Sequence, residues 1–158
     1  MIDNNNFDSE RAEILKRWLR ENVPGTYTIE EFQTEKNFSL KVSPKNPAAS
    51  QVGIYSQNGS TQIHVGSSFF FDEFDGLYAD DGSIVTSRLS DDELLELISA
   101  IAKGQLYELV WYRFGESCRE LFVQFHEKEL RQVHWLSPLM FRRPGIKRKI
   151  QYEAYLPA

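Results

Sequence analysis

The chain has 158 residues, of which 41% are hydrophobic, 26% charged and 13% aromatic, and its formal net charge is −5. A chain of this length and composition can bury a core of its own, so we expect one globular domain over residues 1–158 and exclude a disordered protein. The negative charge disfavours general nucleic-acid binding, because phosphate backbones are held by basic surfaces.

Cys118 is the only cysteine, so no internal disulfide can form. The first residues have neither the basic nor the apolar region of a secretory signal, and both features indicate a cytoplasmic protein. No apolar run approaches the roughly 20 residues needed to cross a bilayer, so we expect no membrane partner.

A first helix is predicted from about residue 9 to residue 22. Its apolar residues recur on one face, and they are Ile14, Leu15, Trp18 and Leu19. Asp8 or Ser9 can cap its start, and Pro24-Gly25 ends it.

Short segments that follow this helix are rich in strand-forming residues. They are 27–32, 38–42, 51–55 and 61–65. Asn58-Gly59 between the last two segments is a strong hairpin signal. The segments follow one another closely, which favours antiparallel pairing over parallel crossovers.

The segment 69–82 crowds aromatic rings among carboxylates and contains no lysine or arginine. Its apolar residues fall at helical spacing, so we expect one or two helical turns, kept short by two glycines. Exposed Phe side chains would lower solubility, so Phe70, Phe71 and Phe74 are expected in the core. The acids then face outward as a candidate partner-binding surface, and they are Asp72, Glu73, Asp75, Asp80 and Asp81. The alternative is a solvated acidic loop.

A second helix is predicted near residues 90–103. Ser90 and Glu93 form a capping box, and the acids at 91–93 suit the positive end of the helix dipole. Lys103 and Gly104 end the helix. These acids therefore have a structural cause, and we leave them out of the candidate surface.

Residues 107–114 and 118–126 predict a hairpin, and residues 147–155 predict a last strand. If 115–117 form a three-residue loop, one face carries Glu108, Tyr112 and Glu120. With Trp111 nearby, these residues would line a pocket between sheet and helices, where two carboxylates and a tyrosine could do acid–base work. The alternative is a solvated polar sheet face.

Basic side chains gather towards the end of the chain. They are Arg142, Arg143, Lys147, Arg148 and Lys149. They could grip phosphates while Trp135 and Phe141 stack on bases, or they could guard an edge strand against aggregation. The histidines and the cysteine are too dispersed for a metal site, and no phosphate loop or dinucleotide fingerprint is present. We therefore expect no metal and no cofactor.

Together these elements predict an α+β fold. We expect a mostly antiparallel sheet of about six or seven strands, with the N-terminal helix and the helix near 90–103 packed on one face.

The stretch Ser90 to Phe125 resembles a pattern in small bacterial α+β proteins. An acid-capped helix ends at Gly104-Gln105, and Leu106-Tyr107-Glu108 then opens a hairpin. Some such proteins are immunity proteins of polymorphic-toxin systems. The resemblance covers less than a quarter of the chain and is one of architecture, so it assigns no binding residue. It implies a cytoplasmic domain that neutralises a toxin by binding it.

The leading hypothesis is therefore a non-enzymatic protein-binding domain, such as a toxin-neutralising immunity protein, whose acidic surface meets a basic partner. The alternative is a small-molecule-binding protein or enzyme with a pocket between sheet and helices. A third hypothesis is nucleic-acid binding through the basic C-terminal zone.

Overall fold

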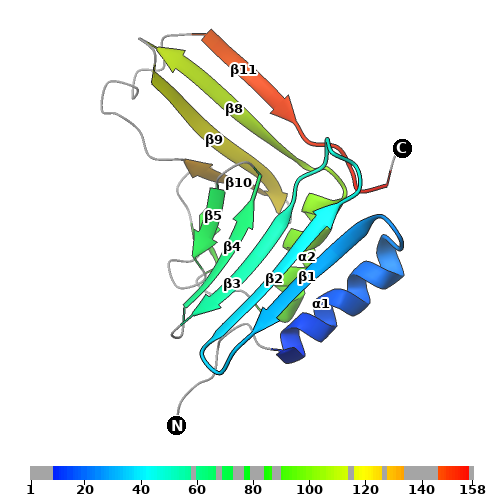
Figure 1. The fold of residues 1–158 in the computed structure, drawn as a ribbon. Helices are drawn as coiled ribbons and strands as arrows, with labels where there is room; N and C mark the ends of the chain where they lie inside the picture. The colour runs from blue at the N-terminus through cyan, green and yellow to red at the C-terminus, as the bar shows by residue number, and fades with distance from the viewer. Residues whose placement is uncertain are drawn as a thin grey trace.

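The computed structural model describes residues 9–57, 60–66, 69–72, 77–78, 84–86, 90–113, 116–125, 128–133 and 146–156 (Figure 1). The helices in this part of the chain are α1 (Ser9–Asn22) and α2 (Asp91–Ala102). The strands are β1 (Tyr27–Gln33), β2 (Asn37–Pro44), β3 (Val52–Gln57), β4 (Ser60–Val65), β5 (Phe69–Asp72), β6 (Leu77–Tyr78), β7 (Ile84–Thr86), β8 (Leu106–Arg113), β9 (Glu116–Phe125), β10 (Lys128–Val133) and β11 (Ile146–Gln151). The predicted α+β class and both predicted helices are confirmed.

The described strands form two main sheets, and all neighbouring strands within them are antiparallel. One sheet has the order β1-β2-β3-β4-β5, the other has the order β10-β9-β8-β11, and β6 and β7 form a short ribbon. The prediction of a single sheet was therefore wrong. The strands that follow α2 in the chain pack against that helix through β9 instead of extending the first sheet.

Helix α2 begins and ends where its sequence predicts. The hydroxyl of Ser90 accepts a hydrogen bond from the backbone N–H of Glu93, and the Glu93 carboxylate accepts one from the backbone N–H of Ser90, both at 3.2 Å. Lys103 is the C-cap, and Gly104 follows it with φ of 72°, a left-handed conformation that suits glycine.

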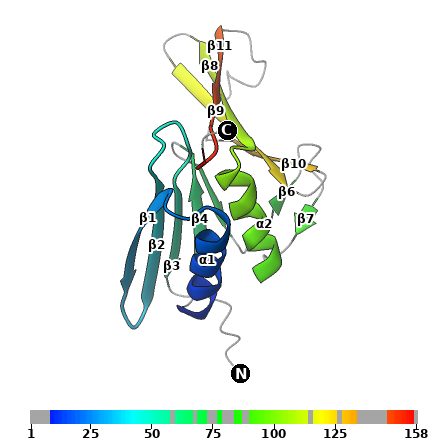
Figure 2. The same cartoon turned by 90° about the vertical axis from the view of Figure 1, so that its right-hand side faces the viewer.

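Both helices cover the same face of the five-stranded sheet, as Figure 2 shows. The alternation along β2 explains why this face is buried: Phe38, Leu40 and Val42 are inside, while the residues between them are more exposed. An ion pair of 2.9 Å joins Arg11 of α1 to Asp91 at the start of α2. Neither helix in the described chain is long and apolar enough to span a bilayer.

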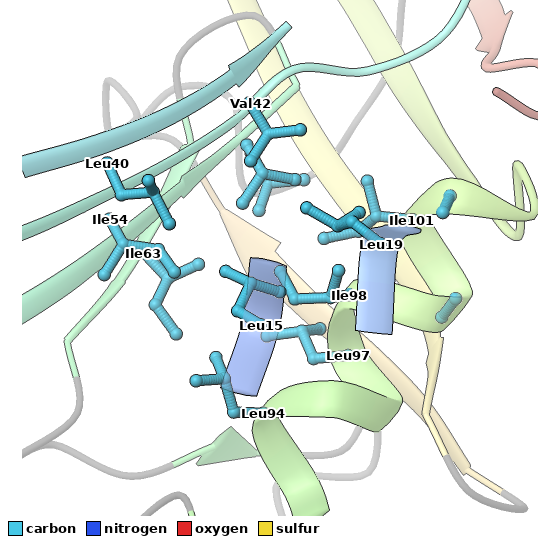
Figure 3. Packing of buried hydrophobic residues seen from close by; sticks show 14 of the residues in the cluster. Leu15, Leu19, Leu40, Val42, Ile54, Ile63, Leu94, Leu97, Ile98 and Ile101 are labelled. Carbon is cyan, nitrogen blue, oxygen red and sulfur yellow. The ribbon is translucent and has the colours of Figure 1, made fainter. Parts of the chain in front are cut away.

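The hydrophobic core lies between the helices and both sheets. Figure 3 shows Leu15 and Leu19 of α1 beside Leu97 and Ile101 of α2. The same cluster includes Leu40, Ile54 and Ile63 from the first sheet and Leu106, Leu121 and Val123 from the second. Each fully buried Leu or Ile side chain contributes about 1.5–3 kcal/mol, so this cluster is the main force that joins the two sheets.

The segment that begins at Phe69 is a strand where it was expected to form helical turns. Residues Phe69–Asp72 pair with β4, and Leu77–Tyr78 pair with β7. Consecutive aromatic residues favour a strand, and β4 offers an edge for pairing, so the helical spacing was misleading. The expected burial of the three Phe rings stays a prediction, because their side chains lie outside the described part.

Candidate functional site

The predicted acidic surface lies mostly outside the described residues. Among its five acids only the backbone of Asp72 is described, at the end of β5, where it pairs with Gln62 of β4. Glu73, Asp75, Asp80 and Asp81 lie outside the described part, so their outward orientation stays a prediction.

The prediction that Glu108 and Glu120 share one face of the hairpin was wrong. In β8 and β9, Glu108 lies opposite Leu121, and Leu109 lies opposite Glu120. Directly opposite residues share one face of a sheet and successive residues alternate, so the two carboxylates point to opposite faces. The predicted three-residue loop was wrong for the same reason, because Arg113 pairs with Glu116 and leaves two residues between the strands.

Glu108 and Glu120 are not solvated either, since both have 0% of their surface exposed. The expectation of a polar face open to water was therefore wrong as well. The backbones of Trp111 and Tyr112 lie in β8, but their side chains are outside the described part. The pocket expected between sheet and helices stays a prediction, and it lacks the pair of converging acids.

Glu108 lies beneath the end of β4 and beside the C-terminal segment. The hydroxyl of Tyr152 donates a 2.6 Å hydrogen bond to Oε1 of Glu108. A Cβ placed on Gly66 would clash with the same oxygen, so a side chain there would force the buried carboxylate to shift. This carboxylate is thus part of a packed polar junction between the two sheets.

A second set of hydrogen bonds extends that junction. Ser50 is buried; its hydroxyl accepts a 2.9 Å bond from the N–H of Gly66, and its carbonyl accepts a 2.9 Å bond from the Tyr155 hydroxyl. Burial raises the pKa of Tyr155, so this hydroxyl stays protonated and can donate. The C-terminal segment is therefore held against the start of β3, which is a structural role.

Two adjoining cavities lie along the outer side of α1 and α2, away from the predicted pocket. Their volumes are about 340 Å³ and about 430 Å³, and both are lined by Trp18, Ser99 and Lys103. The smaller one is the more polar, with Asp92 and Glu96 in its wall, whereas the larger one has more apolar walls. A cavity of this size can hold a small organic molecule.

The face of the five-stranded sheet that is turned away from the helices is here called the outer face (Figure 2). Register places Phe32 opposite Ser39, Ser39 opposite Tyr55, and Tyr55 opposite Gln62. These four residues form a cross-strand row, here called the outer row. Phe32 is 62% exposed and Tyr55 is 41% exposed, so two large apolar side chains of this row meet solvent.

Tyr55 is the centre of the outer face. Its ring covers the backbone of Gly53, where an added Cβ would lie 2.7 Å from a ring carbon. Its ring also meets the His64 ring edge-on, with 4.7 Å between the centroids. His64 is half-buried; desolvation lowers its pKa, which favours the neutral ring at pH 7. The contacts with Gly53 and His64 thus fix the position of the Tyr55 ring, and its exposed side is open to a partner.

A charged row runs beside the outer row. It pairs Glu30 of β1 with Lys41 of β2, and Lys41 with Gly53 of β3. The outer face therefore combines exposed aromatic surface with charges of both signs, which is the mixture found at protein interfaces.

Strand alternation in the sequence already marks the outer face. Val52 and Ile54 are inward-facing, so the alternation of a strand assigns Tyr55 to the outward face. The same alternation assigns Phe32 outward from half-buried Ile29. An aromatic residue at a solvent-facing strand position is the pattern that marks this surface.

No protein-family model, no curated protein and no solved structure matches the chain. Across the described ranges, no group of three or more His, Cys, Asp or Glu residues is arranged to hold a metal ion. The function is therefore inferred from the geometry of this molecule.

Proposed function

We propose that this chain is a non-enzymatic protein-binding module that holds its partner against the outer face. The observation that carries the proposal is the outer row. Among the described residues, the large hydrophobic side chains exposed to solvent are Phe32, Tyr55 and Leu156, and two of these three share that row. Single exposed apolar residues are ordinary, but two in one cross-strand row of an open face mark a contact surface.

The spacing of these rings suits a protein partner. Phe32 and Tyr55 are separated by one strand, β2, so they stand about 10 Å apart along the row. Aromatic residues are enriched at the centres of interfaces, where they fill pockets of the partner. A partner that covers both rings would bury a continuous strip of the sheet.

The partner we propose is a basic protein, as a toxin neutralised by an immunity protein would be. Three features support this: the net charge of −5, the acidic segment from Asp72 to Asp81, and the pairing of Asp72 with Gln62. Because Gln62 belongs to the outer row, the acidic segment begins where that row ends. Acidic surface at the rim of an aromatic contact accelerates the capture of a basic partner.

The test begins with capture of the partner from the producing cells, its identification by mass spectrometry and its purification. Binding of the purified partner is then measured for the native chain and for Phe32→Ser and Tyr55→Ser. We expect each variant to weaken binding by about tenfold or more, since an aromatic hot-spot residue contributes about 2 kcal/mol or more and about 1.4 kcal/mol is tenfold.

Leu156→Ser is the matched control, because Leu156 is 45% exposed and lines the larger cavity instead of the outer face. Its affinity should stay within about twofold of the native value. Equal losses for all three variants, or none for the outer row, would contradict the proposal.

Salt provides a separate test of the acidic segment. Asp→Asn at Asp72, Asp75, Asp80 and Asp81 should slow association and reduce its salt dependence, because screened charges act mainly on the association rate. A tight partner that is indifferent to both salt and these changes would rule out the acidic part of the proposal.

A second candidate function is small-molecule binding at the adjoining cavities. The observation that favours it is the shared lining of Trp18, Ser99 and Lys103, which brings an aromatic ring, a hydroxyl and a cation together. A fragment screen followed by amide chemical shifts tests it. Ligand-induced shifts at Ser99 and Lys103 that disappear in Trp18→Ala would support this function, and an absence of hits there would rule it out.

A further inference from the structure

Strand β1 is the open edge of the five-stranded sheet. It is the first strand in the order β1-β2-β3-β4-β5 and pairs with β2 from Tyr27 to Gln33 in unbroken register. Figure 1 shows it at the margin of that sheet. Five consecutive residues from Glu30 to Thr34 are exposed, so a further strand can reach this edge.

The hydrogen bonds at the ends of β1 reveal which backbone groups face outward. The N–H of Lys45 donates to the carbonyl of Thr26, and the N–H of Thr34 donates to the carbonyl of Asn37. Bonded and non-bonded pairs alternate in an antiparallel ladder, so the even-numbered residues of β1 bond to β2. Ile29, Glu31 and Gln33 therefore direct their N–H and C=O groups to the free edge, where β1 pairs with no second strand of the described chain.

The charges on β1 differ from those on β11, one of the two edge strands of the other sheet. On β11, Arg148 and Lys149 are exposed, which is a common protection of an edge against further pairing. On β1 the charged residues are Glu30 and Glu31, and there is no Lys, Arg or Pro. Basic residues therefore protect the β11 edge, whereas the β1 edge is acidic.

Acidic residues on β1 discourage one class of partner and favour another. If two copies of the chain paired through β1 around its central residue, Glu30 would lie opposite the Glu30 of the second copy, and like charges directly opposite destabilise a sheet. Glu31 already forms an ion pair with Lys16 of α1, and that contact raises the pKa of Lys16. Glu30 is exposed and can meet a cation on an added strand.

We propose that the β1 edge accepts an extended basic segment of the partner protein as an added strand of the sheet. Main-chain bonds to Ile29, Glu31 and Gln33 hold the segment, and a Lys or Arg beside Glu30 selects it, which is the mode known as strand addition. Phe32 belongs to both β1 and the outer row, so the added strand continues the contact surface. The inference rests on the proposed function for the basic character of the partner.

The test uses a synthetic probe of defined chemistry. A capped heptapeptide of alternating valine and lysine, Val-Lys-Val-Lys-Val-Lys-Val, is added to the ¹⁵N-labelled chain, and amide hydrogen exchange is followed by NMR. At saturation the amides of Ile29, Glu31 and Gln33 should exchange about tenfold more slowly. Those of Thr28, Glu30 and Phe32 should change little, since they already bond to β2.

Two controls separate backbone pairing from general attraction. The same peptide with glutamate in place of lysine should bind about tenfold more weakly, because the cross-strand pair with Glu30 changes from attractive to repulsive. The lysine peptide N-methylated at alternate residues, on its bonding edge, should not slow exchange at all. This second control leaves the protein unaltered, so a folding defect cannot mimic it.

A variant tests the edge from the protein side. Gln33→Pro removes one outward N–H and leaves the bonds to β2 intact, whereas Gln33→Ala keeps that N–H. We expect the proline variant to lose peptide binding and the alanine variant to keep it. Equal affinity for the lysine and glutamate peptides would overturn the proposal. A dimer detected by sedimentation would also overturn the proposal if Gln33→Pro dissociates it. The β1 edge would then pair with a second copy of the chain.

The captured partner distinguishes this inference from the proposed function. If its binding needs Tyr55 but is indifferent to Gln33→Pro, the outer face stands and the edge inference fails. If it needs the Gln33 N–H but is indifferent to Tyr55→Ser, the edge stands and the outer-face proposal fails.

Discussion

The hydroxyl of Tyr152 donates a 2.6 Å hydrogen bond to Oε1 of Glu108, a residue with 0% of its surface exposed. A buried carboxyl group is costly unless hydrogen bonds replace the water it has lost. Tyr152 directly follows β11, and its backbone N–H also donates to the carbonyl of Leu106 at 3.3 Å. The end of the chain is therefore fastened to β8 by both backbone and side chain.

Removal of the Tyr152 hydroxyl should destabilise the fold. Tyr152→Phe takes away a donor to a buried carboxyl group, and we expect the free energy of unfolding to fall by about 1–3 kcal/mol. Denaturant titration measures it. Tyr55→Phe is the control, because Tyr55 is exposed at the outer face and its change should be within about 0.5 kcal/mol. Equal effects of the two variants would contradict the structural role of the Tyr152–Glu108 bond.

Gly66 should tolerate a side chain less well than Gly25 does. Both have positive φ, 65° and 72°, so an alanine at either position carries the same backbone strain of about 1–2 kcal/mol. A Cβ on Gly66 would also clash with Oε1 of Glu108, whereas a Cβ on Gly25 meets nothing within 4 Å. Gly66→Ala should therefore lower thermal stability clearly more than Gly25→Ala. A smaller loss at Gly66 would show that the carboxylate moves aside freely.

The sequence predicted best what depends on neighbours in the chain. Ser90 and Glu93 determine the start of α2 because their bonds form within one helical turn. The hairpin register failed because it was chosen by sorting apolar residues onto one face, which assumes that the other face is wet. Leu109 and Phe122 are buried on one face and Leu106 and Leu121 on the other, so both faces of this sheet are covered in this region.

The candidate site was missed for a related reason. The acidic residues of the sequence gather after Phe69, whereas the exposure of Phe32 depends on which sheet face the helices cover. That choice is made by packing between distant elements, such as the ion pair of Lys16 with Glu31. Alternation along β3 predicts that Tyr55 and Ile54 point to opposite faces of the sheet. It does not predict that the face carrying Tyr55 is open to solvent.

The cap of α2 should contribute measurably to stability. Ser90→Ala removes the hydroxyl that accepts from the N–H of Glu93, and we expect a loss of about 1 kcal/mol in the free energy of unfolding. Ser90→Gly should cost less than Ser90→Ala, because glycine is itself a tolerated N-cap. Chemical denaturation of both variants gives the comparison. A larger loss for glycine than for alanine would indicate that the hydroxyl is not acting as a cap.

Stability should depend on pH through His64. Desolvation lowers the pKa of the folded-state His64 below its usual value of 6.5, so the unfolded chain takes up a proton on this ring before the folded chain does. The contribution of the neutral ring is then fully present above about pH 6.5 and is lost as pH falls through the folded-state pKa. We expect the stability advantage of the native chain over His64→Gln to shrink between about pH 7.5 and pH 5, because glutamine does not titrate. Denaturant titrations of both proteins at each pH measure this difference, in which the other histidines cancel. A difference that stays constant, or grows on acidification, would mean that the His64 ring accepts its proton freely beside Tyr55.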